Sequence, residues 1–196
     1  DGMERSYDEI HRLLDRLNVP SDGLVFRGST GYLEGPGQPQ DSDAARDLVK
    51  KANASDEPLY VLAIGAITNV ASAILLDPNI IQNIVVVWLG GHEHHRPSAR
   101  EFNLQQDLYA SRLIFDCGVP FVQIPCRSVA SHLLTTLPEL EAYVQGKSAV
   151  GDFLTETVRG YHKDHYAWAK EIWDISGTAY LVNPDWVTTR LVHSPI

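Results

Sequence analysis

Three polar side chains in the late half of the 196-residue chain stand in patterns suited to binding a polyol. Glu101 and Asn103 flank Phe102 in the stretch S-A-R-E-F-N-L-Q-Q-D, and Asp174 directly precedes an apolar run in E-I-W-D-I-S-G-T-A-Y-L-V-N-P. In an extended segment, this two-residue spacing would place Glu101 and Asn103 on one face and Phe102 on the other. A carboxylate beside an amide can both accept from and donate to vicinal hydroxyl groups. The alternative is a solvated loop that Phe102 anchors.

Asp174 and a second motif, at residues 64–71, also have a purely structural interpretation as helix caps. Asp174 is well placed to cap the helix that should follow it, because a carboxylate accepts hydrogen bonds from free N–H groups at a helix start. In I-G-A-I-T-N-V-A, residues 64–71, Gly65 ends a predicted strand, and Thr68 and Asn69 are expected to cap the next helix. The functional alternative is that the carbonyl groups at this strand end face a cleft.

A histidine cluster offers a different chemistry. His92, His94 and His95 surround Glu93, and histidine with glutamate is a typical ligand set for zinc. The alternative is a solvated loop whose histidines bind no metal, since a zinc site needs three or four converging ligands. His162 and His165 are expected to lie on the solvated face of a long helix.

The elements that must position these residues follow from the hydrophobic pattern. Residues 58–64 and 83–89 are continuous apolar runs that end in glycine, which predicts strands covered by helices on both faces. A third strand is expected at 120–124 and a short one at 24–26, with a loop over 27–39. Helices are expected at 7–17, from Asp41 or Ser42 through Val49, and at 68–76, 107–116, 138–145, 149–170 and after Asp174.

This alternation of strands and helices predicts a single α/β domain with a parallel sheet. In open parallel sheets, ligands bind outside the carboxyl ends of the strands. That rule directs attention to residues 65–69 and 90–103, to the turn after Ile124, and to Asp174.

Composition excludes several classes of function. The formal net charge of −9 argues against broad binding to nucleic acid or to anionic membranes, both of which need a basic face. We find no apolar run of about 18 residues that would cross a membrane. Two cysteines, Cys117 and Cys126, are too few for a disulfide scaffold, which favours a reducing, cytoplasmic location. The chain opens at Asp1 rather than Met, so it is expected to be a piece of a longer protein.

Taken in order, the motifs resemble those of the inosine–uridine nucleoside hydrolase family over nearly the whole chain. Residues 64–71 resemble the family's Gly-x-Leu-Thr-Asn-x-Ala helix start, and 89–91 resemble its Met-Gly-Gly strand end. Residues 101–107 resemble its Glu-Phe-Asn-x-x-x-Asp segment, and 174–184 resemble its late Asp-x-x-x-x-x-Tyr-Leu-x-x-Pro segment. The resemblance implies an open, mostly parallel Rossmann-like sheet flanked by helices, in one domain over residues 1–196.

The resemblance also implies an activity: Ca²⁺-dependent hydrolysis of the N-glycosidic bond between ribose and a base. Asp174 and the main-chain carbonyl of Ile64 would be calcium ligands. Glu101 and Asn103 would bind ribose hydroxyls, and Leu89 would line the sugar pocket. His95 stands where the family has an asparagine that touches ribose. The implied partners are a small-molecule nucleoside and further copies of the chain, with no nucleic acid and no membrane.

Two departures from the family pattern bear on activity. The N-terminal Asp-x-Asp-x-x-x-Asp-Asp cluster, which supplies most calcium ligands in the family, is absent from the sequence, and the C-terminal part is expected to be short as well. Trp173 stands where the family has a histidine that helps to protonate the leaving base. Indole cannot shuttle a proton near neutral pH, although it can stack on a base.

Three interpretations follow. The first is a divergent nucleoside hydrolase, which would show little or no activity as the isolated chain. The second is a member of the same fold that binds a sugar or nucleoside without catalysis. The third is a zinc-dependent hydrolase that uses the loop of His92, His94 and His95.

Overall fold

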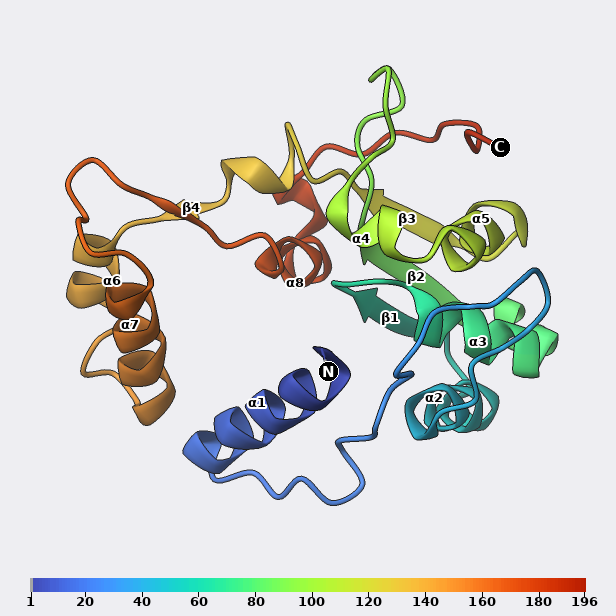
Figure 1. Ribbon diagram of the computed structural model, residues 1–196, viewed down its shortest axis with the longest axis horizontal. Coiled ribbons are helices and arrows are strands. Elements are labelled where there is room, and N and C mark those ends of the chain that lie inside the picture. The colour runs from blue at the N-terminus through green and yellow to red at the C-terminus, as the bar shows by residue number, and fades with distance from the viewer. Residues whose placement is uncertain (1) are drawn as a thin grey trace.

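A three-stranded parallel sheet lies at the centre of the computed structural model, which describes residues 2–196 (Figure 1). The elements follow in the order α1 (Gly2–Leu17), α2 (Asp43–Ala54), β1 (Leu59–Ala63), α3 (Thr68–Leu76), η1 (Pro78–Gln82), β2 (Ile84–Leu89), α4 (Phe102–Gln106), α5 (Leu108–Asp116), β3 (Phe121–Ile124), η2 (Ala130–His132), β4 (Leu134–Thr135), α6 (Leu137–Tyr143), α7 (Ala149–Tyr161), β5 (Lys170–Glu171), α8 (Ile175–Val182) and η3 (Pro184–Trp186).

The sheet has the order β1-β2-β3, so β2 is its central strand. Both pairings are parallel, with Leu59 opposite Ile84 and Val86 opposite Phe121. All three strands therefore end at the same edge, which is the edge where a parallel sheet binds ligands. The predicted α/β class with a parallel sheet is confirmed.

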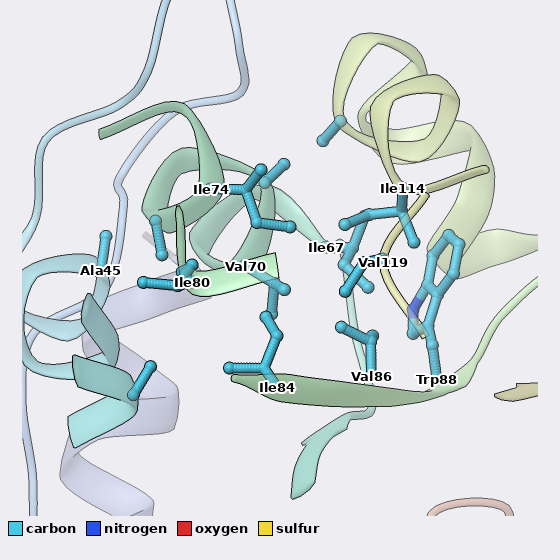
Figure 2. Close-up of a cluster of buried hydrophobic side chains, with 14 of the residues drawn as sticks. Ala45, Ile67, Val70, Ile74, Ile80, Ile84, Val86, Trp88, Ile114 and Val119 are labelled. Carbon is cyan, nitrogen blue, oxygen red and sulfur yellow. The ribbon is translucent and has the colours of Figure 1, made fainter. Parts of the chain in front are cut away.

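Two apolar clusters lie on opposite faces of β2, because successive side chains of a strand alternate between faces. Ile84, Val86 and Trp88 point toward α3 and α5, where they form the larger cluster with residues such as Ile67 and Ile114 (Figure 2). On the other face lies a smaller cluster of Val87, Leu89, Ile124 and Ala130, with Trp173 and Tyr180 packed against it. Strand β2 is thus covered on both faces, as its continuous apolar run predicts.

Strand β1 is covered less completely than predicted. Tyr60 is 52% exposed and Leu62 is 38% exposed, and the opposite face of this strand is only half-buried. Within residues 2–196, β1 forms one edge of the sheet, and its only strand partner is β2. Helix α8 reaches this face, where a side chain at Gly177 would lie 3.4 Å from Leu62. A single helix does not cover the whole strand, so the prediction of two covered faces is wrong for β1.

Three other element predictions differ from the structure. Residues 24–26 form no strand, because the N–H groups of Leu24 and Val25 donate to the carbonyl of Ser21 in a turn. Helix α1 begins at Gly2 rather than at residue 7, and none of its residues is fully buried. Helix α7 ends at Tyr161 rather than at residue 170, because His162 adopts extended backbone and bonds locally to the backbone of Asp164.

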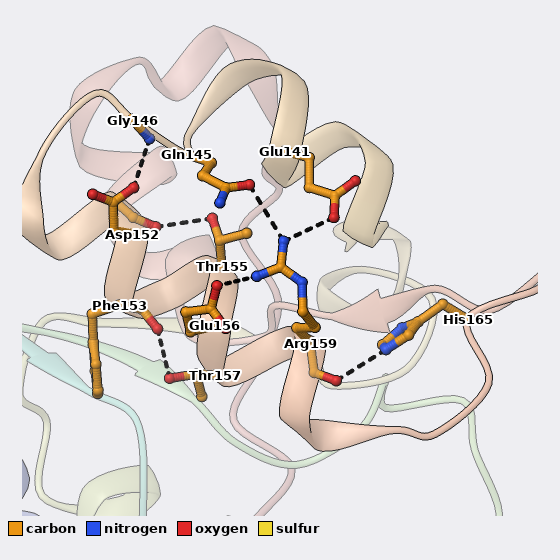
Figure 3. Close-up of polar contacts among 11 residues, drawn as sticks. Glu141, Gln145, Gly146, Asp152, Phe153, Thr155, Glu156, Thr157, Arg159 and His165 are labelled. Carbon is orange, nitrogen blue, oxygen red and sulfur yellow. Dashed lines mark hydrogen bonds and ion pairs between the residues drawn. The ribbon is translucent and has the colours of Figure 1, made fainter.

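Helices α6 and α7 form a separate pair away from the sheet (Figure 1). Arg159 on α7 bridges the two helices by donating to Glu141 at 2.8 Å and to Gln145 at 3.3 Å, and it also pairs with Glu156 (Figure 3). The carboxylate of Asp152 accepts from the N–H of Gly146 in the connecting turn at 2.6 Å. Helix α6 thus ends at Tyr143 rather than at residue 145, and α7 begins at residue 149 as predicted.

Candidate functional site

The side chain of Asn103 joins the carboxyl ends of β1 and β2. Its amide Nδ2 donates to the carbonyl oxygen of Leu89 at 2.8 Å and to that of Ile64 at 3.3 Å. Asn103 is buried, so these bonds satisfy an amide that has little access to water. Residues from three separate motifs therefore meet at one point, at the edge of the sheet where ligands are expected.

Glu101 lies beside Asn103 and is only 6% exposed. Its carboxylate accepts from the N–H groups of Gly91 at 2.8 Å, and of Asn103 and Leu104 at 3.0 Å each. These bonds make Glu101 the N-cap of α4. Main-chain dipoles thus hold a buried negative charge next to the amide of Asn103.

The predicted extended geometry of residues 101–103 is wrong, because α4 begins directly after Glu101. The expected division of side chains nevertheless holds, since Glu101 and Asn103 are buried whereas Phe102 is 71% exposed. Phe102 therefore does not anchor the segment, although the solvated-loop alternative requires such an anchor.

Thr68 and Asn69 do not cap α3, contrary to expectation. The N-cap position is Ile67, and no side chain there bonds to the helix start. The hydroxyl of Thr68 instead donates to Asp107 at 2.6 Å. The side-chain oxygen of Asn69 accepts from the N–H of Ser29 at 2.8 Å and from the hydroxyls of Ser29 and Ser42. Both side chains are used for contacts between elements, which a local pattern cannot reveal.

Asp107, expected as the last residue of a motif and the first of a helix, connects three parts of the fold. Its buried carboxylate accepts from Thr68 on α3, from the N–H of Leu33 at 3.0 Å, and from the N–H of Ala110 at 2.9 Å. The last of these bonds makes Asp107 the N-cap of α5. An aspartate directly before an apolar helix is a recognisable capping signal, but the two bonds between elements have no sequence signature.

Asp174 stands at the N-cap position of α8, but its side chain accepts no cap hydrogen bond from that helix. The capping interpretation is therefore wrong. Neighbouring groups remove part of its hydration, which raises the pKa of this carboxyl, while the nearby ammonium of Lys170 acts in the opposite direction. The side chain still reaches solvent. Asp174 thus presents a carboxylate that is not engaged by α8.

Trp173 is half-buried against the smaller apolar cluster, which contains Leu89. Trp173, expected in place of a family histidine, therefore packs against the cluster that contains Leu89, which is expected to line the sugar pocket. This packing also brings the start of α8, with Asp174, to the face of the sheet opposite α3 and α5.

The histidine loop does not gather its histidines around one point. The Nε2 atom of His94 hydrogen-bonds to Gln123 at 2.8 Å, that of His92 contacts the carbonyl of Arg100 at 3.2 Å, and His95 is exposed. The hydroxyl of Ser128 and the guanidinium of Arg96 lower the pKa of Glu93 to about 2. In the described part of the chain, no three His, Cys, Asp or Glu side chains form a group that could hold a metal ion. The zinc interpretation thus finds no ligand set.

The lack of such a group among the described residues also bears on whether this chain can bind calcium. Calcium takes about 6–8 oxygen ligands, mostly carboxylates and carbonyls. The carboxylate of Asp174 and the carbonyl of Ile64 are the right kind of oxygen, but Ile64 already accepts from Asn103. Two such groups are far too few, so residues 2–196 do not form a calcium site by themselves.

Two further features lie apart from these residues. A cavity of about 580 Å³ is lined by Leu33, Leu75 and Tyr109 among others, but by none of the predicted site residues. Among residues 2–196, no helix has both the length and the apolar character needed to cross a membrane.

Comparisons with known proteins agree with the geometry. A family model described as inosine-uridine preferring nucleoside hydrolase matches residues 4–196. The pyrimidine-specific ribonucleoside hydrolase RihB of Escherichia coli O1:K1 is 26% identical over 190 residues, which cover 89% of this chain and 59% of that protein. The chain thus spans about three fifths of the length of this curated relative.

Solved structures show the same fold. A plant nucleoside hydrolase, PpNRh1, superimposes with a TM-score of 0.67 at 21% identity, over 93% of this chain and 66% of that one. A purine-preferring ribonucleoside hydrolase from Gardnerella vaginalis also gives a TM-score of 0.67, at 24% identity, over 80% of this chain and 52% of that one.

Proposed function

The chain belongs to the inosine-uridine preferring nucleoside hydrolase family, and on this basis we propose that the protein hydrolyses the N-glycosidic bond of ribonucleosides to give ribose and free base. The observation that best supports the proposal is the pair of hydrogen bonds from Asn103 to the carbonyls of Ile64 and Leu89, with Glu101 buried beside it. Residues singled out for sugar recognition therefore meet at the carboxyl ends of parallel strands.

Glu101 and Asn103 would bind the ribose hydroxyls in this proposal. A carboxylate has about four lone-pair sites, so Glu101 can accept from a hydroxyl in addition to the N–H groups that hold it. Both N–H donors of the Asn103 amide are used by the carbonyls of Leu89 and Ile64, so its oxygen is the atom that would accept from a hydroxyl. Because these side chains are buried and fixed, little ordering is required when a sugar binds.

Charge stabilisation is the second contribution of these residues. Glycosidic bond cleavage passes through a transition state that resembles an oxocarbenium ion, so positive charge develops on the ribose. Two carboxylates, Glu101 and Asp174, would stabilise this charge if they lie beneath the sugar.

Departure of the base needs a different arrangement from the one expected in the family. Trp173 occupies the position of the histidine and has only an N–H donor, so it cannot serve as a general acid. Its packing against the cluster of Leu89 makes it an apolar wall. We propose that this wall contacts the base or the sugar and excludes water from the bond that breaks.

The test uses the protein together with its natural flanking sequence. Purified protein is incubated with inosine, adenosine, uridine and cytidine, and free base is measured by liquid chromatography. We expect base release from at least one nucleoside and a large loss of release in Glu101→Gln. The matched control is Gln105→Ala, at an exposed position of the same helix. Absence of release from all four nucleosides would refute the hydrolase proposal.

A second candidate is a nucleoside-binding protein without catalysis, and Trp173 is the observation that favours it. Calorimetric titration with the same nucleosides separates the two functions. Binding without base release would support the second candidate, whereas base release at many turnovers per protein would exclude it.

A further inference from the structure

Trp88 lies one residue before Leu89 on β2 and is 0% exposed. Its ring packs against those of Phe115 and Phe121, each with centroids 6.3 Å away, and these two rings meet edge to face at 5.2 Å. The indole stands at the end of the larger apolar cluster, beside Val119 and Ile114 (Figure 2). Because rings and aliphatic side chains surround it, the indole has little freedom to rotate.

The indole N–H of Trp88 donates to the carbonyl of Gly65 at 2.9 Å. Gly65 directly follows Ile64, whose carbonyl accepts from Asn103. Two consecutive carbonyl groups at the end of β1 are therefore held by different partners, one from the core and one from the site. By fixing the carbonyl of Gly65, Trp88 restricts the orientation of the neighbouring carbonyl of Ile64.

The side-chain direction of Gly65 is open. A β-carbon placed at Gly65 would meet no heavy atom within 4 Å, so nothing packs against the residue on that side. Glycine also has the widest choice of backbone conformations. The hydrogen bond from Trp88 thus restrains the carbonyl of Gly65, which directly follows that of Ile64.

The same indole supports the end of β2. A β-carbon at Gly90 would lie 2.4 Å from a ring atom of Trp88, which shows that the backbone rests directly on the ring. The next residue, Gly91, donates its N–H to Glu101 at 2.8 Å. One side chain therefore contacts both strand ends from which Asn103 and Glu101 take their main-chain partners.

We propose that Trp88 is a positioning residue: its indole fixes the ends of β1 and β2 relative to each other and thereby sets the geometry of Glu101 and Asn103 toward ribose. This role rests on the proposed nucleoside hydrolysis for its functional meaning. Trp88 itself lies on the core side of the strand ends and is not assigned any contact with substrate.

The test compares Trp88→Phe with Trp186→Phe in the protein with its natural flanking sequence. Phenylalanine keeps an apolar ring at position 88 but removes the N–H, and Trp186 is an exposed tryptophan that serves as the matched control. A second variant, Trp88→β-(3-benzothienyl)alanine, keeps the shape of the indole and replaces only its N–H by sulfur. This variant preserves the test if the smaller phenyl ring prevents folding.

Two measurements are made on folded protein. Hydrogen–deuterium exchange by mass spectrometry follows the peptide that contains the N–H groups of Gly91, Asn103 and Leu104, with α2 as the reference. Kinetics with the best nucleoside give KM and kcat separately. We expect faster exchange at the site peptide but not in α2, and a loss of about tenfold in kcat/KM with a raised KM, since one buried carbonyl loses its donor.

The outcomes separate the role of Trp88 from the hydrolase proposal. Equal increases of exchange in α2 and in the site peptide, with unchanged KM, would show a merely structural role and overturn the inference. Unchanged exchange at the site peptide would overturn it as well. If the wild-type protein releases no base but the exchange difference is selective, the hydrolase proposal fails while the positioning by Trp88 is supported.

Discussion

The carboxylate of Glu101 has main-chain partners that a neutral amide can only partly satisfy. Gly91, Asn103 and Leu104 all direct N–H groups at it. In Glu101→Gln, the new NH₂ group offers no acceptor to these donors, and the remaining bonds lose their ionic character. We expect the free energy of unfolding to fall by about 1–3 kcal/mol, measured by urea denaturation. The same measurement on Gln105→Ala should change little, and equal effects in both variants would contradict the role of Glu101.

Asp174 should influence stability in a pH-dependent way. Lost hydration raises the pKa of its carboxyl above the ordinary value of 3.8, so folding disfavours the ionised form. The stability that comes from the protonated form is complete below pH 3.8 and is lost as pH rises through the folded-state pKa. Asp174→Asn should therefore be more stable than wild type near neutral pH, and the gain should vanish in acid.

The expected gain is less than about 1 kcal/mol, because solvent screens a side chain that still reaches water. Thermal unfolding between acid and neutral pH measures it, with Asp185→Asn on the exposed η3 turn as the control. If Asp174→Asn were less stable than wild type at neutral pH, the carboxylate would have a stabilising partner and the interpretation would be wrong.

At the scale of single residues, the sequence indicates which side chains matter but not which atoms they contact. Glu101 and Asn103, which the sequence pairs, both lie buried in one place, and their contact with ribose stays a prediction. The extended geometry expected for this segment does not predict the contacts of Asn103 with Leu89 and Ile64, because the segment is in fact a helix start. The indole bond of Trp88 was missed for a related reason, since a buried tryptophan looks like any other core residue in sequence.

At the scale of elements, Asp107 couples two helices and a loop. Asp107→Asn replaces one acceptor oxygen by an NH₂ group, so either Thr68 and Leu33 or Ala110 must lose its partner. We expect a loss of about 1–3 kcal/mol in the free energy of unfolding. Asp116→Asn, at the exposed end of the same helix α5, is the matched control. Equal stability of the two variants in urea would show that these bonds contribute nothing.

Elements with a continuous apolar pattern were predicted best. Strand β2 and helix α3 lie within one residue of their expected bounds, because their burial follows directly from composition. The exposed face of β1 was not foreseen, since a strand's sequence does not reveal which neighbours cover it. The early end of α7 depends on local bonds between the His162 ring and the backbone of Asp164, which a hydrophobic pattern does not reveal.

At the scale of the molecule, residues 1–196 on their own should be a poor enzyme. Of the expected calcium ligands, the described residues supply the carboxylate of Asp174 and the carbonyl of Ile64, well short of the coordination that this ion requires. We expect residues 1–196 to show no saturable calcium-dependent rise in Tm and little base release. The protein with its natural flanks serves as the comparison. A clear rise of Tm with micromolar calcium in the isolated chain would contradict this expectation.

The incompletely covered strand β1 also has a consequence for handling the protein. Within residues 2–196, one side of this strand has no strand neighbour, and Tyr60 and Leu62 stand exposed on its surface. An unpaired edge of this kind is a template onto which a strand of another molecule can add, with aggregation as the usual result. Preparations of residues 1–196 should therefore lose monomer as they are concentrated, and assays that find them inactive are meaningful only when run dilute and shortly after gel filtration.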